Sequence, residues 1–214
     1  MKTVHILGND TFARHAPWDN PGKDHFWWLN AFHVQQPPEA MDVISAWFEM
    51  HTFRRMERRW QFRHMRWLRR NHSFPIYMRR KYEDVPKCVP YPLREVACLA
   101  PGVNFKTLFG CTHSYMLGLA ILHGFKRIRL YGVNLMGVVE TYLEKPSFQF
   151  WHGFAVAQGI EVDTTHSPYL MPEILYGIRG RSAPAHVPHS VRVYTYNVET
   201  YGSELEPVSV EEED

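Results

Sequence analysis

The sequence predicts an α/β fold, a single Rossmann-like domain over residues 1–178 with a mainly parallel sheet flanked by helices. Short β-prone segments alternate there with helical segments, as in chains that build parallel sheets. Two of the strands, Thr3–Leu7 and Arg127–Tyr131, run directly into glycine, which lets main chain approach a ligand at the carboxyl end of a strand. Residues 179–214 lose the alternation, so we expect an irregular C-terminal extension, partly strand, with an acidic tail.

Composition is that of a globular protein. The chain has 214 residues, 45% of them hydrophobic, enough for one domain with a sizeable core. No run approaches the roughly 18 apolar residues of a membrane span, and a strand beginning at Thr3 leaves no room for a signal peptide. We therefore expect a cytoplasmic protein without membrane contact. The sequence leaves open whether it forms a homo-oligomer. The cysteines Cys88, Cys98 and Cys111 lack CxxC spacing, which argues against a disulfide framework or a zinc site.

The first strand ends in Gly8, Asn9, Asp10 and Thr11. A Rossmann-like fold meets its nucleotide at this place, because glycine lets the backbone approach phosphate and asparagine can donate to it. The four residues are not a GxGxxG motif, and taken alone they fit a simple β-turn better than a nucleotide site. We expect all four in a nucleotide site.

The next segment, His25–His33, is apolar and aromatic around the single polar residue Asn30, and prolines follow at 37 and 38. Val43–His51 is read as a strand, although so short an apolar run also fits a helix. Phe53–Arg70 predicts a helix with one buried stripe. The stripe consists of Phe53, Met56, Trp60, His64 and Trp67.

Positive charge is concentrated in and after that helix. Residues 54–81 contain eleven Lys and Arg residues against the single acid Glu57, so the rest of the chain is net acidic. This asymmetry favours a polyanionic partner or a phosphate-rich substrate over a neutral one. A solvated face is the simpler alternative. The candidate anion-binding residues are Arg55, Arg58, Arg59, Arg66 and Arg69.

Phe74–Met78 reads as a further strand, which Pro75 permits only at its start or at a sheet edge. Residues 84–94 contain three prolines and are expected to form a loop that could cover the site. Farther along, Glu140–Gln158 predicts a helix, and Ile160–Asp163 a last strand followed by Thr164–Ser167. The helix is expected to bury Phe150, Phe154, Val156 and Ala157.

The central block, residues 107–135, reads as a polar loop, a helix, a glycine and a strand. Its helix should bury Leu117, Ala120 and Ile121 and end at Gly124, because a helix C-terminus commonly needs a positive φ. Its N-terminus, where free N–H groups attract phosphate, carries Thr112, His113 and Ser114. At the end of its strand, Tyr131, Gly132 and Asn134 are candidate ligand contacts.

This block, TLFGCTHSYMLGLAILHGFKRIRLYGVNL, resembles the centre of bacterial sialyltransferase-like and motility-accessory glycosyltransferase-like proteins, and of hydroxymethylpterin pyrophosphokinase-like (MptE-like) proteins. It is also similar to uncharacterised tailed-phage proteins, which would place the chain in the host cytoplasm. The resemblance implies a Rossmann-like fold and makes Asn30 a second nucleotide contact. The related proteins carry Gly-Asn/Gly-Gly-Pro-Ser after the first strand, a pattern from which Asp10 and Thr11 depart.

For acid–base chemistry the first choice is His166, because a histidine at a strand's carboxyl end can take a proton from an attacking hydroxyl near neutral pH. His113, Asp10 and Glu140 are alternatives, and a hydrogen-bonded loop histidine is an equally good reading of His166. None of the thirteen histidines forms HExxH, so no metal site is predicted, although a divalent ion bridging a nucleotide diphosphate stays possible. Nucleophile-elbow and Walker A motifs are absent from the sequence.

The preferred function is a nucleotide-dependent transferase, most simply a glycosyltransferase with a nucleotide-sugar donor. In this reading Gly8, Asn9 and Asn30 hold the donor, and the acceptor is phosphate-rich, such as phage-modified nucleic acid. Thr112, Ser114 and Asn134 would line the cleft. The rival is a non-catalytic protein of the same fold that binds a nucleotide, a nucleic acid or a host protein. Pyrophosphate transfer is a further alternative, but the sequence shows no clustered carboxylates for magnesium.

Overall fold

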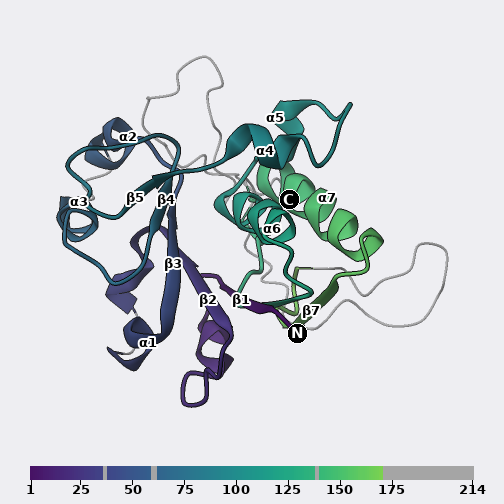
Figure 1. Cartoon of the computed structure of the whole chain (residues 1–214), viewed down its shortest axis with the longest axis horizontal. Helices are drawn as coiled ribbons and strands as arrows, with labels where there is room; N and C mark the ends of the chain where they lie inside the picture. The colour runs from purple at the N-terminus through teal and green to yellow at the C-terminus, as the bar shows by residue number, and fades with distance from the viewer. Residues whose placement is uncertain (36–37, 59–61, 138–139, 171–214) are drawn as a thin grey trace, which may run out of the picture.

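The structure, a computed structural model, describes residues 1–35, 38–58, 62–137 and 140–170 (Figure 1). Its centre is a seven-stranded sheet in the order β5-β4-β3-β2-β1-β6-β7, and every neighbouring pair is parallel. The expected parallel α/β fold is therefore confirmed. The strands are β1 Thr3–Leu7, β2 His25–Leu29, β3 Ile44–Glu49, β4 Ile76–Met78, β5 Cys88–Pro90, β6 Arg127–Tyr131 and β7 Glu161–His166.

Helices cover both faces of the sheet. Figure 1 shows α2 and α3 on one side and α6 and α7 on the other, with α4 and α5 beside α6. The α-helices are α1 Pro38–Val43, α2 Phe53–Arg58, α3 Phe62–Leu68, α4 Leu93–Ala97, α5 Phe105–Leu108, α6 Thr112–Leu122 and α7 Lys145–Ala157. Two short 3-10 helices, η1 Thr11–His15 and η2 Asn30–Gln35, and a π-helix, η3 Glu140–Glu144, complete the described elements.

The strand order positions the site. Strands β1 to β5 are added in one direction, after which the chain returns to the other side of β1 for β6 and β7. The boundary between β1 and β6 is therefore the topological switch point, where loops leave for opposite faces and ligands of such sheets bind. Val4, Ile6, Ile128 and Leu130 are almost completely buried there, so the switch point rests on a rigid core.

Several local predictions are confirmed. Strands β1 and β6 have the predicted bounds, and Gly124 follows α6 with φ +70°. Leu117 and Ala120 are buried in α6, whereas Ile121 is only half-buried. The last strand continues beyond the expected Asp163 to His166, so Thr164–His166 belong to β7 itself.

Two predictions were wrong. The proline-rich segment 84–94 contains β5, which prolines permit because it is an edge strand and Pro90 is its last residue. Helix α7 buries Phe148, Trp151 and Ala155, spaced by three and four residues, while Val156 is 52% exposed. The indole N–H of Trp151 donates to the carbonyl of Leu108 at 2.7 Å, and this contact from outside the helix helps to select the buried face.

The predicted helix 53–70 is described as two helices, α2 and α3, which end at 58 and 68. Residues 59–61 between them lie outside the described residues. Met56, His64 and Trp67 of the expected stripe are buried and Phe53 is half-buried. Arg66 and Arg69 are exposed, whereas the side chains of Arg55, Arg58 and Arg59, like Trp60, are outside the described part.

The proposed C-terminal extension, residues 179–214, lies wholly outside the described residues. Among the described helices none is long and apolar enough to cross a membrane.

Candidate functional site

The turns that follow β1 and β6 touch each other at the switch point. The amide of Gly8 donates to the carbonyl of Tyr131 at 2.8 Å, and the amide of Asp10 donates to the carbonyl of Gly132 at 3.2 Å. Gly132 has φ +68°, a conformation that favours glycine. A side chain at Gly8 would collide with the main chain of Gly132. The contact leaves Asn9 exposed at the carboxyl edge of β1.

Asp10 and Thr11, the two departures from the Gly-Pro-Ser pattern, begin the 3-10 helix η1. Asp10 is its N-cap, and its Oδ1 accepts from the amide of Phe12 at 3.1 Å and from the Thr11 hydroxyl at 3.2 Å. The carboxylate therefore has a local structural task at the start of η1.

Asn30 links the end of β2 to the start of α6. It has φ +52°, a strained value for a residue other than glycine, although asparagine tolerates it better than most. Its Oδ1 accepts from the Thr112 hydroxyl at 3.5 Å, and its carbonyl accepts from the Trp47 indole at 3.0 Å. Two predicted site residues separated by 82 positions are thus brought together.

The side chains at the N-terminus of α6 differ in their contacts. Its N-cap, Cys111, makes no side-chain capping hydrogen bond. Ser114 is fully buried, and its hydroxyl lies 2.7 Å from the hydroxyl of Ser147 in α7 and 3.2 Å from the sulfur of Cys111. Ser114 thus ties α6 to α7, and of the three predicted residues, all of them buried, only Thr112 bonds to the Asn30 side chain.

His113 is a buried histidine with an unused nitrogen. Burial lowers its pKa to about 4, against the opposing effect of a hydrogen bond to the backbone of Leu7. Its Nε2 has no hydrogen-bond partner among the described residues. The ring is therefore neutral at pH 7, and an unsatisfied polar atom lies where β1 meets α6.

At the end of β6, Tyr131 and Asn134 are both buried. The Oδ1 of Asn134 accepts from the amide of Tyr169 at 3.2 Å, while its Nδ2 has no partner within the described ranges. Nδ2 of Asn134 and Nε2 of His113 are thus two polar atoms without a partner, in the part of the chain that the structure describes, at the same edge of the sheet. Leu135, which follows it, has φ +50° and marks a strained turn.

His166 lies at the end of β7, half-buried. Its ring stacks on Tyr131, with centroids 5.0 Å apart, and on His15 of η1 at 5.3 Å. Its carbonyl accepts from the amide of Gly132 at 2.8 Å. The predicted base therefore lies at the expected edge, one strand beyond β6.

Sequence reasoning missed an acidic group at the end of β3. Glu49 is fully buried, and its two carboxylate oxygens lie 2.7 Å from Nδ1 of His51 and Nε2 of His64. Burial alone would raise the pKa of Glu49, but the hydrogen bonds from both histidines outweigh it and lower the pKa to about 2. A carboxylate inside the apolar run ISAWFEM was the signal that could have revealed it.

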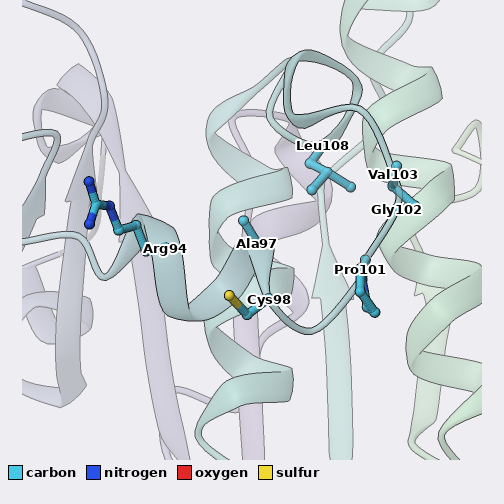
Figure 2. Close-up of a pocket in the computed structure, with 8 residues that line it drawn as sticks. Arg94, Ala97, Cys98, Pro101, Gly102, Val103 and Leu108 are labelled. Carbon is cyan, nitrogen blue, oxygen red and sulfur yellow. The ribbon is translucent and has the colours of Figure 1, made fainter.

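An apolar pocket lies elsewhere, between α4 and the segment that leads to α5 (Figure 2). Its volume is about 370 Å³, and its lining includes Ala97, Cys98, Pro101, Val103 and Leu108. Arg94 also borders it, but Figure 2 shows its guanidinium extending away from the other lining residues. The pocket contains none of the predicted polar residues. In the described part of the chain no group of three or more His, Cys, Asp or Glu side chains is arranged to hold a metal ion.

No family model and no curated protein matches the sequence. Solved structures do match. The α-2,3-sialyltransferase of Campylobacter jejuni in apo form has a TM-score of 0.53 and 12% identity over 93% of this chain and 91% of that one. The sialyltransferase CstII of Campylobacter jejuni, in complex with CMP-3FNeuAc, has a TM-score of 0.52 and 15% identity over 76% and 79%. Its CMP complex has a TM-score of 0.50 and 15% identity over 76% and 78%. The chain is therefore similar in fold to bacterial sialyltransferases, as the resemblance of its central block implied.

Proposed function

We propose that the protein is a glycosyltransferase that uses a nucleotide-sugar donor and binds the nucleotide at the carboxyl edge of the sheet, at the switch point. The observation that carries the proposal is the meeting of Asn30 and Thr112 beside the turn of Gly8 and Asn9. An amide side chain, a hydroxyl and a helix N-terminus at a topological switch point form a suitable environment for a nucleotide phosphate.

A cytidine nucleotide is the first candidate, because the structural neighbours were solved with CMP and with CMP-3FNeuAc. In this assignment Gly8, Asn9 and Asn30 hold the nucleotide, and Thr112 faces its phosphate. His113 and Asn134 each have a buried polar atom without a hydrogen-bond partner among the residues described, beneath this edge. Tyr131 and Gly132 shape the floor of the site. Ser114 supports it from behind, and Asp10 and Thr11 support it through η1.

Transfer needs two further functions at this edge. The phosphate that leaves the sugar gains negative charge, which the N-terminal end of α6 stabilises through its free N–H groups. The attacking hydroxyl needs a proton acceptor. His166, proposed from the sequence, lies at this edge, and so does His51 at the end of β3.

Calorimetry with CMP, CDP, UMP, UDP and GDP tests nucleotide binding. Asn9→Ala and Asn30→Ala should each weaken the binding of the preferred nucleotide about tenfold, the effect of losing roughly one hydrogen bond to a charged group. Asn20→Ala is the matched control, because this exposed asparagine precedes the amino end of β2 at the opposite edge. If no nucleotide or nucleotide sugar binds to the folded wild-type chain, the proposal is wrong.

A second candidate function is binding of a nucleotide or nucleic acid without catalysis. It is favoured by the exposed arginines of α3 and the residues after it, Arg63, Arg66 and Arg70. Incubation with a panel of CMP-, UDP- and GDP-sugars separates the two candidates. Release of free nucleotide supports the transferase, whereas tight binding without release supports the binding protein.

A further inference from the structure

Glu49 is a buried carboxylate with no place in the roles proposed above. It is the last residue of β3, and its side chain is completely shielded from solvent. Both of its oxygens accept short hydrogen bonds from histidines, and the side chain is ionised. Burying such a charge is costly, so the site is built around those two histidines.

One of them, His51, is held in a single orientation. The same oxygen, Oε1 of Glu49, accepts from the main-chain N–H of His51 at 2.9 Å and from its Nδ1 at 2.7 Å. An ionised carboxylate only accepts hydrogen bonds, so Nδ1 carries a hydrogen toward Glu49, and Nε2 is the ring nitrogen that can take up a proton. The His51 side chain is 28% exposed, whereas Glu49 behind it is not exposed at all. The ring therefore reaches the surface with a proton-accepting nitrogen.

This histidine belongs to the same edge as the proposed nucleotide site. The register of β2 and β3 pairs Leu29 with Phe48, so the next residues, Asn30 and Glu49, lie side by side on neighbouring strands about 4.8 Å apart. The Trp47 indole fixes this arrangement by donating to the carbonyl of Asn30.

We propose that His51 is the proton acceptor of the transfer reaction and that Glu49 is its positioning residue; this assignment rests on the proposed function. The acceptor hydroxyl gives its proton to Nε2 of His51 while its oxygen forms a bond to the anomeric carbon. The bond between that carbon and the donor's phosphate oxygen breaks, and its electron pair leaves with the nucleoside monophosphate. Glu49 stabilises the resulting imidazolium, which then returns the proton to solvent.

His51 and His166 cannot both serve one reacting hydroxyl. Their strands, β3 and β7, are four positions apart in the sheet, about 19 Å at the usual strand spacing, whereas a base must be within hydrogen-bond reach. The two rings are also held differently. Stacking on Tyr131 and His15 holds the ring of His166, while a charged hydrogen bond holds that of His51. A carboxylate behind the ring favours the protonated product of base catalysis.

Glu49 could instead serve only to fasten α3 to the sheet, because its other oxygen is bonded to His64. The test therefore compares His51→Gln with His123→Gln. His51→Gln removes the base but leaves Glu49 and His64 in place, and His123→Gln makes the same change at the far end of α6. The measured quantities are CMP affinity, release of nucleotide from CMP-N-acetylneuraminic acid and other CMP-, UDP- and GDP-sugars, and the effect of added imidazole.

His51→Gln should lower kcat by about 10²–10⁴-fold while CMP affinity changes by less than about threefold, and imidazole should restore part of the rate. His123→Gln should behave as wild type. Glu49→Gln, if folded by circular dichroism, should lower kcat with KM retained. A fully active His51→Gln, or parallel loss of affinity and rate without imidazole rescue, would overturn the assignment while leaving the transferase intact. A wild-type chain that binds CMP but releases nucleotide from no donor would refute both the proton-acceptor role and transfer, leaving nucleotide binding in place.

Discussion

The main chains of Gly8 and Gly132 are packed so closely that a β-carbon on Gly8 would overlap the carbonyl oxygen of Gly132. The residues end two adjacent parallel strands, β1 and β6, on either side of the switch point. Because no side chain separates them, the loops that leave for opposite faces of the sheet begin from one shared, rigid support.

Gly8→Ala should therefore destabilise the protein by about 2 kcal/mol or more, since the contact is with main chain that cannot rotate away. Gly153→Ala is the matched control. Gly153 lies in α7 with open space around its position, and alanine there should stabilise by about 0.5–1 kcal/mol. Urea unfolding of the two variants provides the comparison, and equal stabilities would contradict the close packing.

Stability should fall on mild acidification because of His113. Burial lowers its pKa from 6.5 to about 4. Between these two pH values the His113 side chain is protonated in the unfolded chain and neutral in the folded chain. Between pH 7 and pH 5 this costs about 2 kcal/mol of unfolding free energy. Burial also lowers the pKa of His33 to about 4, but this ring is only half-buried, so solvent screening makes its contribution to the loss smaller.

His113→Gln keeps a donor for the backbone of Leu7 but cannot titrate. The variant should lose about 2 kcal/mol less than wild type between pH 7 and pH 5 in urea unfolding. Identical losses in the two proteins would show that His113 gains its proton while folded.

His166→Ala distinguishes the base predicted from sequence from the one proposed from structure. Because its ring stacks on Tyr131, its loss should lower stability by about 1 kcal/mol. Nucleotide release should change by less than about tenfold if His51 accepts the proton. A loss of about two to four orders of magnitude with affinity retained would instead assign the base to His166.

The arginines after β3 predict salt-dependent binding of nucleic acid. Arg63 and Arg66 are exposed on α3, whereas Arg69 pairs with Asp84 at 2.7 Å. Arg63→Glu with Arg66→Glu should weaken any binding to DNA or RNA and flatten its dependence on salt, because fewer counterions are released. The control variant is Lys23→Glu with Lys126→Glu. It makes the same charge change at exposed positions near the amino ends of β2 and β6.

Deleting residues 199–214 is the complementary experiment. It removes acidic charge that could compete with nucleic acid for the arginines. If neither the full chain nor the truncated chain binds nucleic acid at low salt, the arginines serve contacts within the protein or between subunits. The acceptor would then be sought among small molecules.

The sequence by itself determined the parts of this fold that depend on neighbouring residues. The bounds of β1 and β6, the glycines that end them and the positive φ of Gly124 follow from local strand propensity and backbone sterics. These features identified the carboxyl edge of the sheet as the candidate site. The central block also indicated the sialyltransferase-like fold.

Only the tertiary structure decided which distant groups meet. The pairing of Asn30 with Thr112 joins residues 82 positions apart, and that of Glu49 with His64 joins residues 15 apart. Which face of α7 is buried was settled in the same way, through the contact of Trp151 with Leu108. Propensity and periodicity describe a residue and its neighbours in the chain, whereas these contacts arise only when strand order and crossover direction place separate elements side by side.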